Sequence, residues 1–309
     1  MSNQREVFGR TLVELGHTNP DIVVLEADLG KSTMSCYFED VFPQRYFEMG
    51  IAEANMTSFA VGLAATGKTA FVNTFAIFAS GRAYDQVRQG IAIGKVNVKV
   101  VGSSSGLSDF GDGATHQSIE DVALMRAIPN MTVLVPMDGN ETRAMTRWAA
   151  NFNGPVYLRL NRNDMPEYFP ADGTFEIGKP QLVRDGRDAV VFAQGIMVSR
   201  AMAATELLAN RGVSLRVVNL SSMKPVDEAA IRGFAAGMRG IVTAEEHSII
   251  GGVGAVVTHC LRGGGVPIEL VGMPDVFGQS AHGYDELLEY YGLTPQAIAS
   301  AVLKTLGMA

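Results

Sequence analysis

Short runs of consecutive apolar residues recur along the 309-residue chain, separated by longer segments with the spacing of helices. Residues 22–25 (Ile-Val-Val-Leu) are the first such run, and residues 96–101 contain another. A continuous apolar run of this length is typical of a strand that is buried on both faces of a parallel sheet. Consecutive strand–helix–strand units place parallel strands in one sheet and helices on both of its faces. The pattern therefore predicts an α/β fold.

The alternation is interrupted once. Between Asn163 and Gly186 the chain contains three prolines and only isolated apolar residues, and the pattern restarts at residues 189–193. A chain of this length usually makes about two domains. We therefore expect a first domain at residues 1–165, a linker at 166–186 and a second domain at 187–309.

Composition excludes several classes of function. The formal net charge is −7 and the 25 basic residues are scattered, which argues against a face for nucleic acid. No apolar run reaches the roughly 18 residues of a membrane span. The N-terminal residues lack the apolar core of a signal peptide, so we expect a cytoplasmic protein. Cys36 and Cys260 lie far apart and form no metal-binding or redox spacing, so we expect two reduced structural thiols.

Two strand-to-helix junctions carry candidate site residues. Residues 46–56 read as a strand that passes through a glycine turn into a helix, whose first turn carries Glu53. A helix N-terminus stabilises a carboxylate, so a capping acid is the ordinary explanation. Residues 74–78 (Thr-Phe-Ala-Ile-Phe) form a second junction. Open α/β sheets bind ligands at the carboxyl ends of their strands, which makes Glu53, Phe75 and Phe78 candidates.

Residues 50–53 (Gly-Ile-Ala-Glu), the segment through Phe78 and the run Arg-Ala-Tyr-Asp-Gln at 82–86 closely resemble the pyrimidine-binding domain of thiamine-diphosphate enzymes. Within that group they are most similar to the C-terminal half of a transketolase. The resemblance covers nearly the whole chain, because the residues from about 187 resemble the transketolase C-terminal domain. It implies two consecutive open parallel-sheet domains, the pyrimidine-binding fold and then the C-terminal domain.

The resemblance also implies that the chain binds thiamine diphosphate. In the family, the glutamate that matches Glu53 hydrogen-bonds N1′ of the aminopyrimidine ring and promotes its imino tautomer, which removes the thiazolium C2 proton. Such a carboxylate needs a dry, aromatic-lined pocket, where its proton affinity can be raised. Phe75 and Phe78, which we expect three residues apart on one helix, match the rings that stack on and enclose the pyrimidine. Asp28 and Leu29 match further cofactor contacts.

Residues 102–116 form a loop rich in glycine and serine, which is typical of a functional or mobile segment. Its end, Gly-Asp-Gly-Ala-Thr-His-Gln at 111–117, resembles the family's substrate loop. That resemblance implies that His116 takes part in catalysis by contacting the donor ketose and polarising its oxygen. It also implies that Asp112 holds a substrate hydroxyl, and both side chains suit recognition of a polyol. Ser104 stands where the family has the first of two loop histidines, so we expect it in the substrate site too.

Arg5, Ser32 and Arg162 match the positions that contact the acceptor phosphate in the family. Arginine suits forked, charge-assisted bonding of an oxyanion. Gly81 stands where the family has a tyrosine after the stacking aromatics. Because Ser104 differs as well, we expect a sugar preference unlike that of enzymes for ordinary pentose phosphates.

One motif is misleading. Gly-Asp-Gly at 111–113, followed by Asn140, mimics the diphosphate-and-metal motif of thiamine enzymes. Only 110 residues precede it and Glu53 lies in their middle, so the substrate-loop assignment fits better. The domain that binds the diphosphate and Mg²⁺ is then missing, and the chain, which begins with Met, resembles the beta subunit of a split transketolase. We therefore expect a separate N-terminal subunit that holds Mg²⁺ through oxygen ligands, and an α₂β₂ assembly with paired beta chains that acts on sugar phosphates.

The leading hypothesis is half of a transketolase, which transfers a two-carbon ketol unit from a ketose phosphate to an aldose. Deoxyxylulose-phosphate synthase and the beta subunits of oxo-acid dehydrogenases share the Gly-Ile-Ala-Glu signature and remain alternatives. The synthase is normally one long chain, however, and the dehydrogenase subunits generally lack the loop that ends in His116. A catalytically silent scaffold subunit would have no need of Glu53 and His116 together with both phenylalanines. The turn at 245–254 resembles one that is typical of the second domain, and we expect a structural role for it at an interface.

Overall fold

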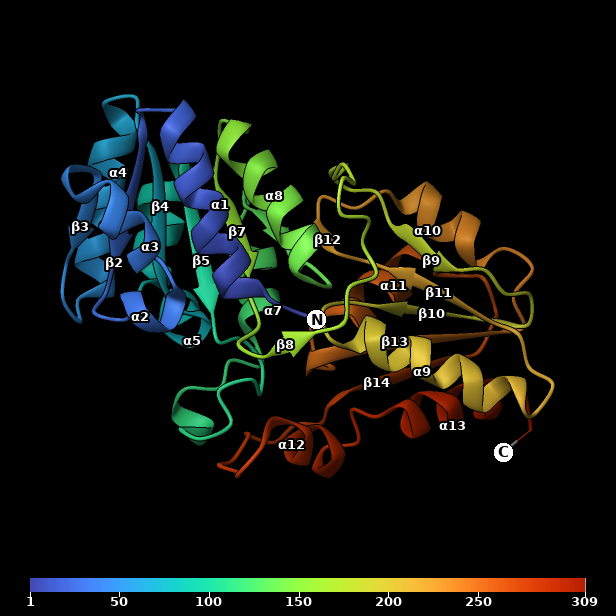
Figure 1. Ribbon diagram of the computed structural model, residues 1–309. Coiled ribbons are helices and arrows are strands. Elements are labelled where there is room, and N and C mark those ends of the chain that lie inside the picture. Colours follow the sequence, from blue (N-terminus) through green and yellow to red (C-terminus); the bar gives the residue numbers. More distant parts are fainter. Residues whose placement is uncertain (309) are drawn as a thin grey trace.

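Two α/β halves lie side by side in the computed structural model, which describes residues 1–308 (Figure 1). The first half is built around a sheet of strand order β12-β6-β7-β5-β4-β2-β3, and the second around a sheet of order β14-β13-β10-β11-β9. Within these sheets neighbouring strands run parallel, except that β12 pairs antiparallel with β6 and β9 with β11. The predicted α/β fold with two mainly parallel sheets is confirmed.

The elements follow each other closely. Those of the first half are β1 (Ser2–Asn3), α1 (Gln4–Thr18), β2 (Ile22–Glu26), α2 (Gly30–Thr33), α3 (Cys36–Val41), a 3-10 turn (Pro43–Arg45), β3 (Tyr46–Glu48), α4 (Glu53–Ala65), β4 (Thr69–Phe75), α5 (Ala76–Ser80), α6 (Tyr84–Gln86), a π-helical stretch (Val87–Ile93), β5 (Val98–Ser103), a 3-10 turn (Gly113–Thr115), α7 (Asp121–Ala127), β6 (Thr132–Leu134), α8 (Gly139–Asn151), β7 (Val156–Arg159) and β8 (Asp164–Met165). The elements that follow in the chain, which belong to the second half except for β12, are β9 (Gln181–Arg184), β10 (Ala189–Ala193), α9 (Met197–Ala209), β11 (Leu215–Asn219), β12 (Ser222–Lys224), α10 (Glu228–Ala235), β13 (Gly240–Ser248), α11 (Val253–Cys260), β14 (Ile268–Met273), α12 (Tyr284–Tyr290) and α13 (Pro295–Thr305).

Strand β2 shows why the apolar runs are continuous. All of its residues are buried, and successive side chains point to opposite faces of the sheet. Ile22 and Val24 pack in one core cluster, which includes residues of α1 and α8. Val23 and Leu25 pack in another, which includes residues of α4 and α7. Helices therefore cover both faces of this strand, and each face needs apolar side chains.

The prediction that Phe75 lies on one helix with Phe78 is wrong. Strand β4 continues through Phe75, because it pairs on one side with β2 and on the other with β5 as far as Ser103. The Asn73 side chain donates a hydrogen bond to the Leu25 carbonyl, so a polar residue that resembles a helix cap lies inside the sheet instead. The helical segment that follows is broken near Gly81, where α5 ends.

Two strands lie in places that the sequence did not predict. Strand β9 lies within the segment 166–186 that we expected to be a linker, and it forms an edge of the second sheet. Strand β12 follows β11 in the chain but belongs to the first sheet, where Ser222 pairs with Leu134. The core cluster of Val23 and Leu25 also contains Val190 and Phe192 of β10, so apolar packing runs from one half into the other.

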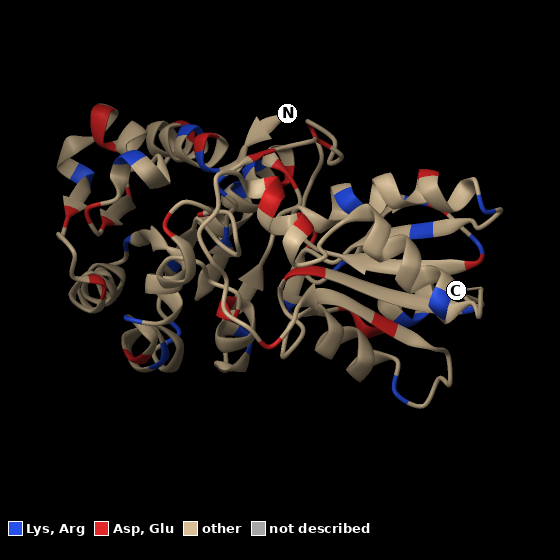
Figure 2. Ribbon diagram, turned by 90° about the horizontal axis from the view of Figure 1, so that it is seen from below, with Lys and Arg blue, Asp and Glu red and all other residues tan. Residues whose placement is uncertain are grey.

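Charged residues of both signs are interspersed over both halves (Figure 2). None of the helices among residues 1–308 is both long and apolar enough to cross a membrane.

Lys99 is a buried cation on β5, in the first half. Its Nζ donates hydrogen bonds of 2.6 Å to the carbonyl oxygens of Phe152 and Gly154. Burial lowers the pKa of Lys99 from its ordinary value of 10.5 to about 7. The unfolded chain therefore binds more protons than the folded chain between these two values, and this residue makes the free energy of unfolding rise with pH in that window.

Lys99→Met should remove that pH dependence. We expect the difference in unfolding free energy between the wild-type protein and the variant to shift in favour of the wild type from pH 7 upward, by at most about 1.4 kcal/mol per pH unit. Urea denaturation of both proteins at a series of pH values measures it. The variant also loses two hydrogen bonds, which changes its unfolding free energy by the same amount at every pH. The readout is therefore the slope of the free-energy difference against pH. Parallel curves would contradict the assignment.

Candidate active site

The predicted cofactor residues gather at the carboxyl ends of neighbouring strands. Asp28 and Leu29 directly follow β2, and Phe75 is the last residue of β4. Glu53 begins α4, the helix that follows β3. Strand β2 lies between β3 and β4 in the sheet, so these residues share one edge. This is the edge at which open α/β sheets bind ligands.

Glu53 is only 3% exposed. Its Oε1 accepts a hydrogen bond of 2.9 Å from Nη1 of Arg82, whose side chain is half-exposed. The same guanidinium lies over the ring of Phe78, with Cζ 4.0 Å from the ring centroid. Arg82 thus connects the buried carboxylate with an aromatic face.

Phe75, Phe78 and His116 form an aromatic group. The two phenylalanine rings are nearly parallel, with centroids 6.0 Å apart. The imidazole of His116 stands edge-on to both, at 6.2 Å from Phe75 and 5.3 Å from Phe78. Phe75 lies at a strand end and Phe78 on α5, so they are not on one helix as predicted, but the structure does bring their rings together with His116.

The residues present fit an aminopyrimidine ring. The guanidinium of Arg82 is planar and carries nitrogen donors. It lies on the Phe78 ring and donates a hydrogen bond to Glu53, so the space between these two residues accepts a flat group with N–H donors at its edge. A pyrimidine ring has the same flatness and also carries nitrogen atoms at its edge. Sequence reasoning gave Arg82 no role, since nothing in the local pattern indicates that this side chain reaches Glu53.

The backbone is strained at two of the predicted positions. Asp28 has φ of 59° and Ser104 has φ of 51°, in the left-handed region that residues other than glycine seldom adopt. The Ser104 hydroxyl is buried and, among residues 1–308, has no hydrogen-bond partner. Unsatisfied buried polar groups and strained backbone both cluster at functional sites, so these observations support Asp28 and Ser104 as site residues.

Arg5, Ser32 and Arg162 meet although they are far apart in the sequence. The Arg5 guanidinium donates to the backbone carbonyls of Ser32 and Arg162. The Arg162 guanidinium pairs with Asp109 at 2.9 Å. Burial and the nearby Arg162 charge lower the pKa of Arg5 to about 10, and its buried Nε has no hydrogen-bond partner within residues 1–308. Two close guanidinium groups make a place suited to an oxyanion.

The loop from β5 to α7 carries the remaining predicted residues. Asp112 is exposed and precedes the 3-10 turn at 113–115, which leads to His116. The His116 Nδ1 and the Thr115 hydroxyl are 2.9 Å apart. His116 therefore reaches the aromatic group, whereas Asp112 faces solvent.

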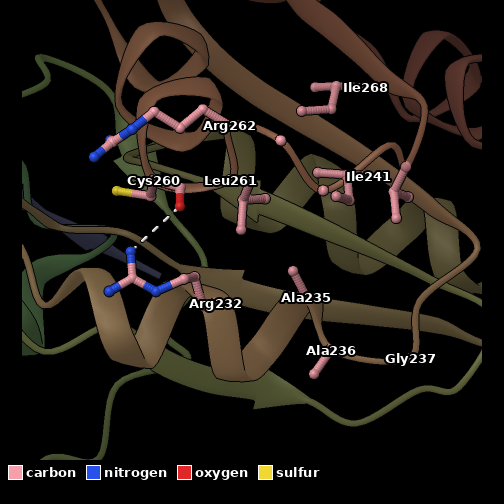
Figure 3. A pocket seen from close by; sticks show the side chains of 12 residues that line it. Arg232, Ala235, Ala236, Gly237, Ile241, Cys260, Leu261, Arg262 and Ile268 are labelled. Atoms are coloured by element: carbon pink, nitrogen blue, oxygen red, sulfur yellow. Dashed lines mark hydrogen bonds between the residues drawn. The ribbon is translucent and has the colours of Figure 1, made fainter.

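A cavity of about 350 Å³ lies elsewhere, in the second half. Apolar side chains such as Ile241 and Leu261 line it, and Arg232 donates to the Cys260 carbonyl at its edge (Figure 3). It contains none of the predicted site residues, so it is not the site described above.

Comparison with known proteins identifies the family of the chain. Residues 2–167 match the model of the transketolase pyrimidine-binding domain, and residues 178–298 match that of the transketolase C-terminal domain. The chain belongs to the transketolase family.

The particular kind of transketolase follows from whole-chain relatives. The chain is 40% identical to the 6-deoxy-6-sulfo-D-fructose transketolase subunit SqwH of a Clostridium species, over 96% of this chain and 92% of that one. It superposes with a TM-score of 0.92 and 44% identity on a split-gene transketolase described as an inactive beta4 tetramer, covering 100% of this chain and 99% of the other. The protein is thus the C-terminal, or beta, subunit of a split transketolase, an enzyme of the thiamine-diphosphate-dependent family.

The alternative of a deoxyxylulose-phosphate synthase is weaker. The synthase of Caldanaerobacter subterraneus is 36% identical over 97% of this chain, but the match covers only 48% of that protein. The transketolase subunit from Clostridium is both more similar and matched over nearly its full length.

Proposed function

We propose that this chain provides the pyrimidine-binding side of a transketolase active site that a separate N-terminal subunit completes. The observation that carries the proposal is the group of Glu53, Phe75, Phe78 and His116 at one sheet edge, with Arg82 held between the carboxylate and an aromatic ring. A buried carboxylate beside flat aromatic faces suits the hydrogen-bonded, protonatable ring of thiamine diphosphate.

Each residue then has a distinct task. Thiamine diphosphate, when bound, supplies the nucleophilic thiazolium carbon that carries the two-carbon unit. Glu53 holds a proton at N1′ of the pyrimidine ring, which Phe75 and Phe78 enclose and keep from water. Asp28 and Leu29 line the cofactor's edge. His116 donates a hydrogen bond to the oxygen of the donor ketose, and Asp112 accepts one from a sugar hydroxyl once substrate and partner are in place.

The acceptor end of the site is assigned to Arg5, Ser32 and Arg162. Their two guanidinium groups suit a terminal phosphate or sulfonate, because both are tetrahedral oxyanions. A relative named for a sulfonated sugar supports this choice. Ser104, in place of an imidazole, and Gly81, in place of a tyrosine, leave more room and fewer strong donors, so we expect a sugar unlike the ordinary pentose phosphates.

The remaining parts of the proposal concern the assembly. We assign Mg²⁺ and the cofactor's diphosphate to oxygen ligands of the N-terminal subunit. The complex is an α₂β₂ heterotetramer in the cytoplasm, with two active sites where alpha and beta chains meet and with contacts between the beta chains.

Reconstitution tests the proposal. The isolated chain should neither bind thiamine diphosphate tightly nor transfer a ketol unit, because the diphosphate has no ligands there. With its N-terminal subunit and Mg²⁺, it should bind two cofactors per α₂β₂ complex and turn over. Isothermal calorimetry measures the first property, and a coupled assay with a ketose phosphate measures the second. Micromolar cofactor binding by the isolated chain would refute the division of the site between two chains.

A further inference from the structure

The loop that follows β5, residues 104–117, ends in the segment that resembles the substrate loop, and a carboxylate from the other half of the chain holds its base. Glu246 lies on β13, in the second sheet. Its Oε1 accepts a hydrogen bond of 2.7 Å from the backbone N–H of Leu107. Its Oε2 accepts one of 3.2 Å from Asn161, which also donates to the hydroxyl of Tyr284 at 2.8 Å. The Glu246 carboxylate, which belongs to the second half, thus holds both the loop and Asn161 of the first half.

The loop backbone approaches this carboxylate very closely. Gly106 has φ of 62°, and a Cβ built there would lie 2.5 Å from Cδ of Glu246. Only glycine allows both this conformation and this approach. Glu246 is 3% exposed and Leu107 is fully buried, so water does not compete for the hydrogen bond between them.

The other end of the loop is also fixed by the second half. The Gln117 side chain donates to the Gln279 carbonyl at 2.9 Å, and the N–H of Ala281 donates to the Phe110 carbonyl at 2.8 Å. Figure 1 shows the loop after β5 lying beside the chain that leads into α12. Asp112 is exposed between these two fixed ends, and the stretch that carries it leads on to His116.

Arg159 also helps to hold the loop against β13. It is buried and paired with Asp121, with Nε 2.9 Å from Oδ2. Its Nη2 donates to the backbone carbonyl of Ser118, just after the loop, and to that of Glu246. The Arg159 guanidinium therefore holds together the backbone that follows the loop and the backbone of β13 that carries Glu246.

We propose that Glu246 is a positioning residue for ketol transfer: it holds the base of the substrate loop, so that His116 meets the donor sugar. This inference rests on the proposed function, because it needs the loop to contact the donor. Glu246 itself touches neither Glu53 nor the aromatic group, so it acts on donor binding and leaves the activation of the cofactor unchanged.

The test compares Glu246→Ala with Glu246→Gln in the reconstituted α₂β₂ enzyme. The alanine variant should raise the KM for the donor by about 10–100-fold, as expected for a lost hydrogen bond to a charged group. The glutamine variant keeps an acceptor oxygen for Leu107 N–H and should restore most of the loss. Xylulose 5-phosphate, fructose 6-phosphate and hydroxypyruvate serve as donors, and the one that the wild-type enzyme turns over fastest is used throughout.

Glu245→Ala is the matched control. Glu245 is the preceding residue on the same strand, is equally buried, and accepts hydrogen bonds from the N–H groups of Val253 and Gly254 at the start of α11. Its loss should lower stability without raising the donor KM. Exchange of the cofactor's C2 proton, followed by NMR in deuterated buffer, should be at the wild-type rate in all three variants, since this readout does not involve the sugar.

The outcomes separate the inference from the proposed function. A wild-type donor KM in Glu246→Ala, equal effects of Glu245→Ala, or a loss of C2–H exchange along with the KM effect would overturn the positioning role. If Glu246→Ala does not fold, Gly106→Ala tests the same contact from the loop side, and it should reproduce the KM effect; an unchanged KM would overturn the role. A wild-type complex without C2–H exchange or ketol transfer would overturn the proposed function and this inference with it.

Discussion

Glu53→Gln should slow exchange of the C2 proton of bound thiamine diphosphate by roughly 10²–10⁴, the usual contribution of positioned acid–base catalysis. The amide keeps the size of the side chain and one acceptor oxygen, so the cofactor should still bind to the α₂β₂ complex. It cannot take up and release a proton, however. Because the Glu53 side chain is buried, bulk water does not take its place as the proton carrier. NMR of C2–H exchange in deuterated buffer measures the rate, and calorimetry measures cofactor binding.

Glu48→Gln provides the control for this prediction. The Glu48 carboxylate accepts backbone hydrogen bonds from Asp28 and Gly50, which an amide oxygen can also accept. The same chemical change should therefore leave exchange close to the wild-type rate. A wild-type exchange rate in Glu53→Gln would contradict the assignment of Glu53 as the residue that promotes removal of the C2 proton. If the wild-type complex itself does not exchange the proton, the interpretation as a silent scaffold subunit gains support instead.

Arg162→Ala should raise the KM for an anionic acceptor by about 10–100-fold, the loss of one charge-assisted hydrogen bond. Turnover at saturation should hardly change, because a contact far from the reacting bond acts equally in the ground and transition states. Glyceraldehyde 3-phosphate and uncharged glyceraldehyde form the matched pair of acceptors, and steady-state kinetics with each measures the effect. The uncharged aldose should be almost insensitive to the substitution.

The structure adds a condition to the Arg162 experiment. Arg162 is one-third exposed and pairs with Asp109, so its removal also leaves a buried carboxylate without its partner. Burial already raises the pKa of Asp109, and Arg162 opposes that rise. Arg147→Ala, which breaks the exposed pair with Glu14, controls for the loss of an arginine as such. If Arg162→Ala weakens both acceptors equally, the residue is structural and the anion binds elsewhere.

Much of the fold could be predicted because its signals are local. The apolar run at residues 22–25 predicted a buried strand, and β2 covers Ile22–Glu26, since a continuous apolar run of this length is a strand signal in itself. The order of elements around Glu53 could be predicted for the same reason. The continuation of strand β4 through Phe75 could not be predicted, because pairing of β4 with two neighbouring strands overrides the preference of Asn73 and Thr74 for a helix start.

The missed parts of the site depend on contacts between distant residues. Arg82 meets Glu53 and Phe78 through its long side chain, and no local pattern records where that side chain turns. Glu246 could be read from sequence only as part of a glycine-bearing turn, because its hydrogen bond to Leu107 crosses between the two halves. The meeting of Arg5 with Arg162 was anticipated only through family resemblance, and the structure supplies the backbone contacts that hold it.

Strand β12 has a consequence for anyone who wishes to divide this polypeptide. It comes after residues 166–186 in the chain, yet it completes the first sheet, and the Val135 N–H donates to the Ser221 carbonyl beside it. A chain cut between residues 166 and 180 would yield an N-terminal fragment with an unpaired β6 edge and uncovered core around Val133. An exposed edge of this kind invites aggregation. Fragments for complementation, circular permutants and domain swaps between relatives should therefore keep residues 221–224 with the pyrimidine-binding half.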